Sequence, residues 1–126
     1  MKISFDFDGT LSEKPIQKIA KKLIFEKNEV WIVTSRIKFT DDPVHKKRHG
    51  EVYSVANYLN IPHERIIFTN AEFKYKFLEE LNIKVHLDDD SEEIKRINKN
   101  KKVKGIICLG KDWKTKFELA IEKLCT

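Results

Sequence analysis

The sequence is poor in cysteine and contains no long hydrophobic run. Its 126 residues include two cysteines, Cys108 and Cys125, of which Cys108 lies in an apolar segment and is interpreted as a buried thiol. Two such cysteines do not make a disulfide framework, so a reducing compartment is expected. No apolar stretch approaches the roughly 20 residues that a membrane-spanning helix needs, and no signal peptide is recognised. These absences predict a soluble, cytoplasmic protein without membrane attachment.

What the sequence contains in abundance is charge. Charged residues make up 36% and hydrophobic residues 40% of the chain, and the formal net charge is +5 with an isoelectric point of about 9.1. The length and apolar content suit a single domain over residues 1–126. We find no repeat, low-complexity segment or linker. A basic balance is compatible with a polyanionic partner, although it also contributes to solubility.

Strand-like and helix-like segments alternate along the chain. Five apolar runs have the composition of strands, at residues 2–7, 29–33, 65–68, 83–87 and 103–109. Apolar residues at helical spacing follow each of them, near residues 15–27, 51–59, 71–81, 91–98 and 112–124. An earlier start of the second helix is left open, and Ser12 and Asn70 are candidate N-caps. The pattern predicts an α/β, three-layer Rossmann-like domain with a central parallel five-stranded sheet and helices on both faces.

The stretch over residues 4–12 carries the strongest chemical signal. An apolar strand ends at Asp6 and Asp8, and Gly9 then permits a tight exit of the chain. Side chains two residues apart on a strand point to the same side. Because like charges this close repel, and because burying them unpaired is costly, they need a cation. A divalent ion bound by oxygen atoms is the simplest candidate.

Other polar residues fall at the same edge of the predicted sheet. The carboxyl ends of parallel strands meet there, and open α/β sheets bind ligands at that edge. Carboxylates can hold a cation, while hydroxyls, backbone amides and a lysine can hold an anion, for which phosphate is the best match to a hard divalent cation. The residues expected at this edge are Asp6, Asp8, Thr34, Ser35, Arg36, Lys74, Asp88, Asp89 and Asp90.

These motifs resemble those of the haloacid dehalogenase superfamily of phosphohydrolases. Residues 6–11 (DFDGTL) resemble its first motif, D-x-D-G-T-[LV], and Thr34 at the end of an apolar strand resembles its second. Lys74 is placed like the third motif, and the pair at 88–89 follows a strand like the fourth. The four elements occur in the family's order and span nearly the whole chain.

The resemblance implies a role for each motif residue. Asp6 is expected to be the nucleophile that forms an aspartyl-phosphate, and Asp8 the general acid and then the base that activates water. The resemblance also implies Mg²⁺, held by the Asp6 carboxylate, the Asp8 backbone carbonyl and an acid of the pair Asp88 and Asp89. The residues expected to bind phosphate are Gly9, Thr10, Thr34, Ser35, Arg36 and Lys74.

Three assignments stay open at this point. Lys76 competes with Lys74 for the third motif, and we favour Lys74 because it lies at the start of its helix, whereas Lys76 falls among apolar residues. Either Asp88 or Asp89 could bind the metal directly. Asp90 could instead cap the helix that follows.

Residues 37–50 are the least regular part of the sequence and are interpreted as a loop on the site edge. The segments between Asp8 and Thr34, and between Thr34 and Lys74, have no room for an inserted cap domain, so an open site is expected. Dense positive charge makes the loop the best candidate for contact with a nucleotide or a nucleic-acid end. Its basic residues are Lys38, His45, Lys46, Lys47, Arg48 and His49.

Two other basic groups receive a plainer interpretation. His45 and His49 have the spacing of metal ligands on a helix, but no third ligand is near in the sequence, so a solvated or phosphate-facing pair is favoured over a zinc site. The run over residues 99–104 precedes a strand. It is therefore expected at the edge of the sheet opposite the site.

Three functions are compatible with these features. The favoured one is a magnesium-dependent phosphomonoester hydrolase acting on a nucleotide, a sugar phosphate or a nucleic-acid terminus. The second is a nucleic-acid-binding module with little turnover, and the third is a regulatory protein with a vestigial site. The complete set of motif residues argues against the last two, because a decayed site is expected to lose some of them. The sequence does not set the oligomeric state.

Overall fold

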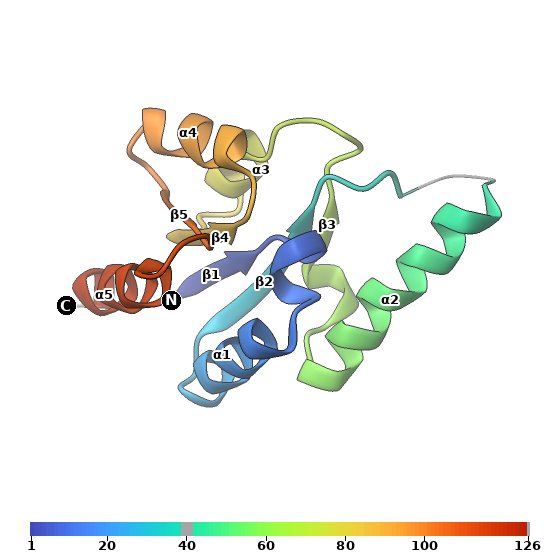
Figure 1. Cartoon of the computed structure of the whole chain (residues 1–126), viewed down its shortest axis with the longest axis horizontal. Helices are drawn as coiled ribbons and strands as arrows, with labels where there is room; N and C mark the ends of the chain where they lie inside the picture. The colour runs from blue at the N-terminus through green and yellow to red at the C-terminus, as the bar shows by residue number, and fades with distance from the viewer. Residues whose placement is uncertain (39–41, 126) are drawn as a thin grey trace.

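A computed structural model describes residues 1–38 and 42–125 of the chain. In this part of the chain, five strands alternate with helices (Figure 1). The strands are β1 (Lys2–Phe5), β2 (Glu29–Thr34), β3 (Ile66–Phe68), β4 (Val85–Asp88) and β5 (Lys104–Ile107). The α-helices are α1 (Lys14–Phe25), α2 (Pro43–Leu59), α3 (Tyr75–Glu80), α4 (Ser91–Lys99) and α5 (Trp113–Cys125). Two short helical turns complete the set, η1 (Phe7–Leu11) and η2 (His63–Arg65).

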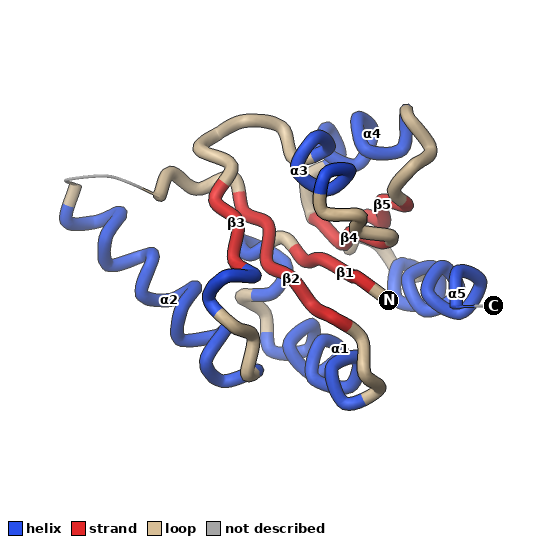
Figure 2. The backbone as a smooth tube through the Cα atoms, turned by 180° about the vertical axis from the view of Figure 1, so that it is seen from behind, coloured by secondary structure: helices blue, strands red, loops and turns tan. Residues whose placement is uncertain are grey.

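The sheet is parallel throughout and has the order β3-β2-β1-β4-β5 (Figure 2). The chain winds outward from β1 to β3 and then returns to the other side of β1 to form β4. The order of winding therefore reverses between β1 and β4, which is the position where open α/β sheets bind ligands. The predicted Rossmann-like α/β fold with a five-stranded parallel sheet is confirmed.

Helices cover both faces of the sheet. Buried residues of α1, α2 and α5 belong to the larger hydrophobic core on one face, and those of α3 and α4 to the smaller core on the other (Figure 1). Phe5 of β1 meets Phe117 of α5 edge-to-face, with ring centroids 5.7 Å apart. Cys108 is buried beside the larger core, as predicted. Both faces of the central strands are thus shielded from water, as the continuous apolar runs require.

The central strands carry polar residues on the α3 and α4 side. Ser4 pairs in register with His86 on the neighbouring strand, and both are fully buried. Because alternate residues of a strand share a face, Asp6 follows Ser4 and Asp88 follows His86 on this side of the sheet. A column of polar side chains therefore runs along β1 and β4 toward their carboxyl ends.

Two of the three candidate caps are wrong. The Ser12 hydroxyl accepts a hydrogen bond from the Gly9 amide instead of capping α1, which begins two residues later. Asn70 has a left-handed backbone, and its side chain accepts from the amide of Lys38, far from the start of α3. Asp90 does cap α4, because its side chain accepts from the amides of the second and third residues of that helix.

The predicted loop over residues 37–50 is wrong for its second half. Helix α2 begins at Pro43, and the Asp42 side chain caps it by accepting from the amide of Val44. Asp-Pro is a helix-start signal, but the basic run that follows carries no apolar periodicity. The positive charge therefore lies on the first turns of a helix. Residues 39–41 of the predicted loop, and the side chain of His45, lie outside the described part of the structure.

The basic run over residues 99–104 leads into β5 and so lies at the amino edge of the sheet, opposite the carboxyl ends of the strands. Within the described residues, none of the helices has the length and apolar composition that a bilayer crossing requires.

Candidate functional site

The site is built on the two strands that flank the reversal of the chain. Asp6 directly follows β1, and its amide donates to the carbonyl of Leu87 on β4 at 2.9 Å. Asp88 is the last residue of β4. Both acids are almost completely buried, with 5% and 0% of their surface exposed. The sheet register therefore brings together two carboxylates that are 82 residues apart in the sequence.

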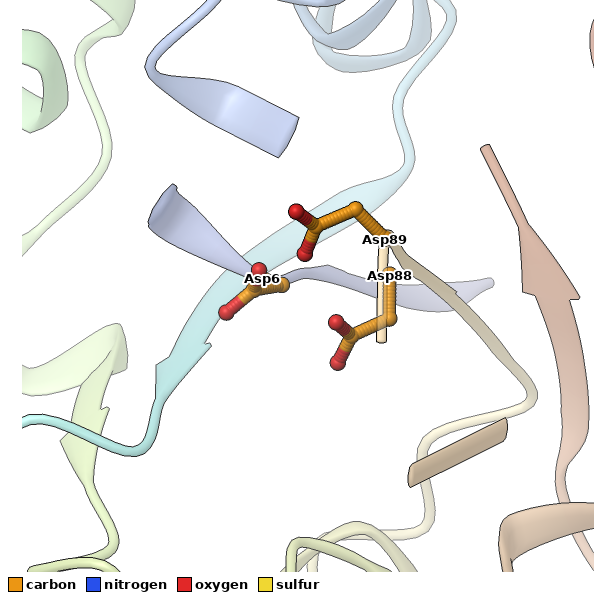
Figure 3. Close-up of side chains that lie close together, drawn as sticks. All are labelled: Asp6, Asp88 and Asp89. Carbon is orange, nitrogen blue, oxygen red and sulfur yellow. The ribbon is translucent and has the colours of Figure 1, made fainter. Parts of the chain in front are cut away.

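Asp89 completes a group of three acids (Figure 3). One carboxylate oxygen from each of Asp6, Asp88 and Asp89 lies within 4.8 Å of the other two. Three carboxylates in this arrangement form a set of hard oxygen donors that could hold a divalent cation. We call these three residues the acid triad.

Gly9 makes room for the acid triad. Its φ is +73°, in the left-handed region that favours glycine. A Cβ atom at this position would lie 2.1 Å from Oδ2 of Asp89. The glycine of the first motif thus has two separate reasons to lack a side chain, the turn and the close approach of an acid.

Lys74 lies between the buried acids. It is the N-cap residue of α3, and its Nζ donates to Oδ1 of Asp6 and to Oδ2 of Asp88, both at 2.7 Å. Only 2% of the lysine is exposed. Lys76, the competing candidate, is exposed and contacts the ring of Tyr75 instead. The structure therefore brings Lys74, and not Lys76, to the acids.

His86 belongs to the same network, although the sequence suggested no role for it. Its Nδ1 lies 2.7 Å from the Ser4 hydroxyl and its Nε2 lies 2.8 Å from Oδ2 of Asp88. Burial lowers the pKa of His86, although Asp88 acts the other way, and so favours the neutral ring. Because a carboxylate only accepts, Nε2 carries the proton and Nδ1 accepts from Ser4. The available signal was its position two residues before Asp88, on the same face of the strand.

Glu93 is a second contributor that sequence reasoning missed. Its Oε1 accepts from the Lys74 amide at 3.0 Å, and the residue is 5% exposed. This bond ties the start of α3 to α4 and so fixes the backbone from which the lysine extends. The signal in the sequence was helical spacing, because Glu93 precedes Ile97 by one turn and therefore shares its buried face.

The network shifts the pKa values of its two buried acids in opposite directions. Burial raises the pKa of Asp6 to about 8. The negative charge of Asp88 also raises it, whereas the positive charge of Lys74 lowers it. Burial also opposes ionisation of Asp88, but the hydrogen bond from His86 and the charge of Lys74 outweigh it and lower its pKa. For Lys74, the two acids outweigh burial and raise its pKa. Asp6 is therefore the member whose ionisation would gain most from a cation at the acid triad.

Asp8 lies in a different setting from Asp6. Its side chain is 49% exposed, whereas that of Asp6 is 8% exposed. Nε and Nη2 of Arg36 donate to its two oxygens at 2.8 and 2.5 Å. The hydrogen bond from Arg36 lowers the pKa of Asp8, although burial acts the other way. The structure thus places Arg36 on the carboxylate of Asp8, and its predicted contact with phosphate stays a prediction.

The predicted phosphate-binding residues differ in burial and in their hydrogen-bond partners. Thr34 is buried at the carboxyl end of β2, and its hydroxyl accepts from the Arg36 amide at 3.3 Å. Ser35 follows it and is exposed. The Thr10 hydroxyl donates to Oδ2 of Asp6 at 3.3 Å and lies 3.5 Å from the Cys108 sulfur. In this structure Thr10 therefore orients the carboxylate of Asp6.

In the part of the chain that the structure describes, no buried side-chain nitrogen or oxygen lacks a hydrogen-bond partner. The network of Ser4, His86, Asp88, Lys74 and Asp6 is thus complete within the protein. Such a network holds its members rigidly, because Nζ of Lys74 and Oδ2 of Asp88 each join two partners.

Comparison with known proteins returns no match, either among family models or among curated protein sequences. The chemistry of the site is accordingly assessed from its geometry. A buried carboxylate held by Lys74 and Thr10 lies beside two further acids, and the three together could hold a cation.

Proposed function

We propose that this chain is a magnesium-dependent phosphomonoester hydrolase of the haloacid dehalogenase type, acting through an aspartyl-phosphate. The observation that carries the proposal is the position of Asp6. Its carboxylate lies within the acid triad and is held by Lys74 and Thr10, at the edge of the sheet where ligands bind. Four motifs in the order of that superfamily give the proposal independent support.

In the first half of the reaction, an oxygen of Asp6 attacks phosphorus. The bond between phosphorus and the ester oxygen breaks, and the leaving alcohol takes a proton. In the second half, water attacks the aspartyl-phosphate, loses a proton and releases inorganic phosphate and the Asp6 carboxylate. A carboxylate needs no base to activate it, and the covalent intermediate divides one difficult step into two easier ones.

The donor set of the acid triad suits the divalent cation that this reaction uses. Asp6, Asp88 and Asp89 would hold it. When bound, it would reduce the electrostatic repulsion between the carboxylate and the anionic phosphate. Lys74 offsets part of the same negative charge through its ion pairs with Asp6 and Asp88. The two cations together would allow an anionic nucleophile to approach an anionic substrate.

Asp8 would exchange protons with the leaving group and then with water. Paired with Arg36, it is a carboxylate, which is the form required to accept a proton from water. Donation to the leaving oxygen requires Asp8 to be protonated, and the arginine opposes this. The arginine must therefore loosen its hold on Asp8 for the first half of the reaction.

A phosphatase screen tests the proposal. Purified protein would be assayed with Mg²⁺ against nucleotides, sugar phosphates and 3′- or 5′-phosphorylated oligonucleotides, with and without a chelator. We expect release of phosphate from at least one class, loss with the chelator and loss in Asp6→Asn. Glu64→Gln is a matched control, because this exposed acid lies before β3 at the opposite edge of the sheet. No turnover, or turnover that survives in Asp6→Asn, would refute the proposal.

A further inference from the structure

A small cavity opens beside Asp8, outside the acid triad. It has a volume of about 220 Å³. Its walls come from the segment after β2, from the second turn of α2 and from the segment after β3. The lining residues are Ser35, Arg36, Ile37, Arg48, His49 and Ala71. The cavity therefore combines two guanidinium groups and an imidazole with apolar walls, at the carboxyl edge of the sheet.

The two arginines connect this cavity to the reacting groups. Arg36 binds Asp8 and also donates from Nη1 to the carbonyl of Arg48. Nη2 of Arg48 lies 3.9 Å from Oδ1 of Asp8. In the proposed reaction Asp8 exchanges a proton with the leaving oxygen, so the leaving group must lie next to Asp8. Whatever follows the leaving oxygen in the substrate then extends toward the cavity.

Arg48 has binding capacity to spare. Its side chain is 53% exposed, and among the described residues Asp8, at 3.9 Å, is the one acid within ion-pair distance. A guanidinium offers five N–H donors in a planar fork that matches phosphate oxygens. Arg36, in contrast, already uses its fork on Asp8. The cationic wall of the cavity is therefore partly unused.

We propose that this cavity binds a second phosphate, on the leaving-group side of the substrate, through Arg48 and Arg36. This inference rests on the proposed hydrolase activity and narrows its substrates to phosphomonoesters whose alcohol carries another phosphate. A second phosphate would also compete with Asp8 for Arg36, which links substrate recognition to release of Asp8. Small bisphosphates and phosphorylated nucleic-acid ends share this chemistry.

The arrangement of α2 also shows which basic residues of this region line the cavity. Arg48 and His49 line the cavity, and the His49 ring packs edge-on against Phe68 with centroids 5.1 Å apart. Lys46 and Lys47 are exposed and do not line it. On a helix, residues one or two positions apart point in different directions. Lys47 is thus a matched control for Arg48, with the same charge on the same helix.

The test compares substrates that carry a second phosphate with substrates that lack it. Wild-type protein, Arg48→Met and Lys47→Met would be assayed with a nucleoside 3′,5′-bisphosphate and the corresponding monophosphates, and with a 3′-phosphorylated dinucleotide. We expect wild type to prefer the two-phosphate substrates by about tenfold or more in kcat/KM. The preference should collapse in Arg48→Met and persist in Lys47→Met. A preference for the dinucleotide over the bisphosphate would identify a nucleic-acid end as the source, and the reverse a small metabolite.

A binding measurement separates failure of this inference from failure of the hydrolase proposal. Asp6→Asn and the double variant Asp6→Asn/Arg48→Met would be titrated with the same ligands by calorimetry in the presence of Mg²⁺. If Asp6→Asn binds the bisphosphate more tightly than the monophosphates, and the double variant does not, the cavity binds a second phosphate even if no substrate turns over. Equal affinity of Asp6→Asn for the bisphosphate and the monophosphates would overturn the inference. So would an equal loss of the preference for two-phosphate substrates in Arg48→Met and Lys47→Met.

Discussion

The two acids of the first motif differ far more in their surroundings than their spacing suggests. Asp6 lies in a buried network with Lys74, His86 and Asp88, where each buried side-chain nitrogen or oxygen has a partner. Asp8, two residues later, is half-exposed and held by one arginine. The break in the strand at η1 separates them, because the backbone there no longer alternates as in a strand. In the proposed reaction, the first environment would hold the Asp6 carboxylate in place, and the second would leave Asp8 accessible to gain and lose a proton.

The largest expected effect comes from removing the buried cation. Lys74→Met leaves Asp6 and Asp88 without their shared partner inside the protein, which is expected to cost about 3 kcal/mol of unfolding free energy and to abolish turnover. Chemical denaturation measures the cost. Mg²⁺ should restore part of the stability, because it supplies positive charge at the same acids. Lys76→Met is the control, and an equal loss there would contradict the role of Lys74.

His86→Phe tests whether the hydrogen bonds of the buried network stabilise the fold. The substitution removes a donor to Asp88 and an acceptor for Ser4. Oδ2 of Asp88 keeps its bond from Lys74, whereas the buried Ser4 hydroxyl loses its acceptor. We expect a loss of about 2 kcal/mol in unfolding free energy. The exposed His63, substituted in the same way, should change stability by less than about 0.5 kcal/mol. If both variants unfold alike, the buried network does not stabilise the fold.

Arg36→Met should lower activity strongly and stability only slightly, unlike the two variants of the buried network. Asp8 is half-exposed, although the Arg36 side chain is 10% exposed, so loss of their ion pair is expected to cost about 1 kcal/mol of stability. Loss of the bond that orients Asp8 should nevertheless lower kcat by about tenfold. Arg65→Met, at the opposite edge of the sheet, removes another ion pair, to Glu29, and should leave kcat unchanged. A loss of stability in Arg36→Met as large as in Lys74→Met would erase the difference between the two environments.

The smallest effect is a pH dependence at Glu93. Burial raises its pKa above the ordinary value of 4.5, so the folded state binds this proton more tightly than the unfolded state. The contribution of Glu93 to stability therefore declines as the pH rises from about 4.5 through its folded pKa. Glu93→Gln keeps an acceptor for the Lys74 amide but cannot ionise. Denaturation curves between about pH 4 and pH 8 should favour the variant increasingly; a difference that shrinks with rising pH would contradict this.

Local patterns in the sequence were sufficient for the sheet and for the acids. Apolar runs mark all five strands, and a parallel sheet brings the acids that end β1 and β4 to one edge. An earlier start of α2 was left open but not located, because the basic residues after Pro43 hide the helical period, although Asp42 is a good cap. Which face of α2 meets the site follows only from its packing, so Arg48 could not be told from Lys47.

The contacts around the acids depend on tertiary structure. His86 and Glu93 could be placed on the right face of their elements from the sequence, but their bonds to Asp88 and to the Lys74 amide require the positions of β1, β4 and α3 relative to one another. The pairing of Arg36 with Asp8 likewise requires β2 to lie beside β1. Lys74 was preferred over Lys76 from its position at the helix start, and the structure gives the physical reason in its two ion pairs.

The central claim is that Asp6, and not Asp8, becomes phosphorylated during turnover. The most direct measurement quenches the protein while it turns over the substrate found in the screen, reduces acyl-phosphates with borohydride and locates the modified residue by mass spectrometry. The account predicts that the modification appears at Asp6, requires Mg²⁺ and is absent from Asp6→Asn. Modification at Asp8, or steady turnover with neither acid modified, would contradict it.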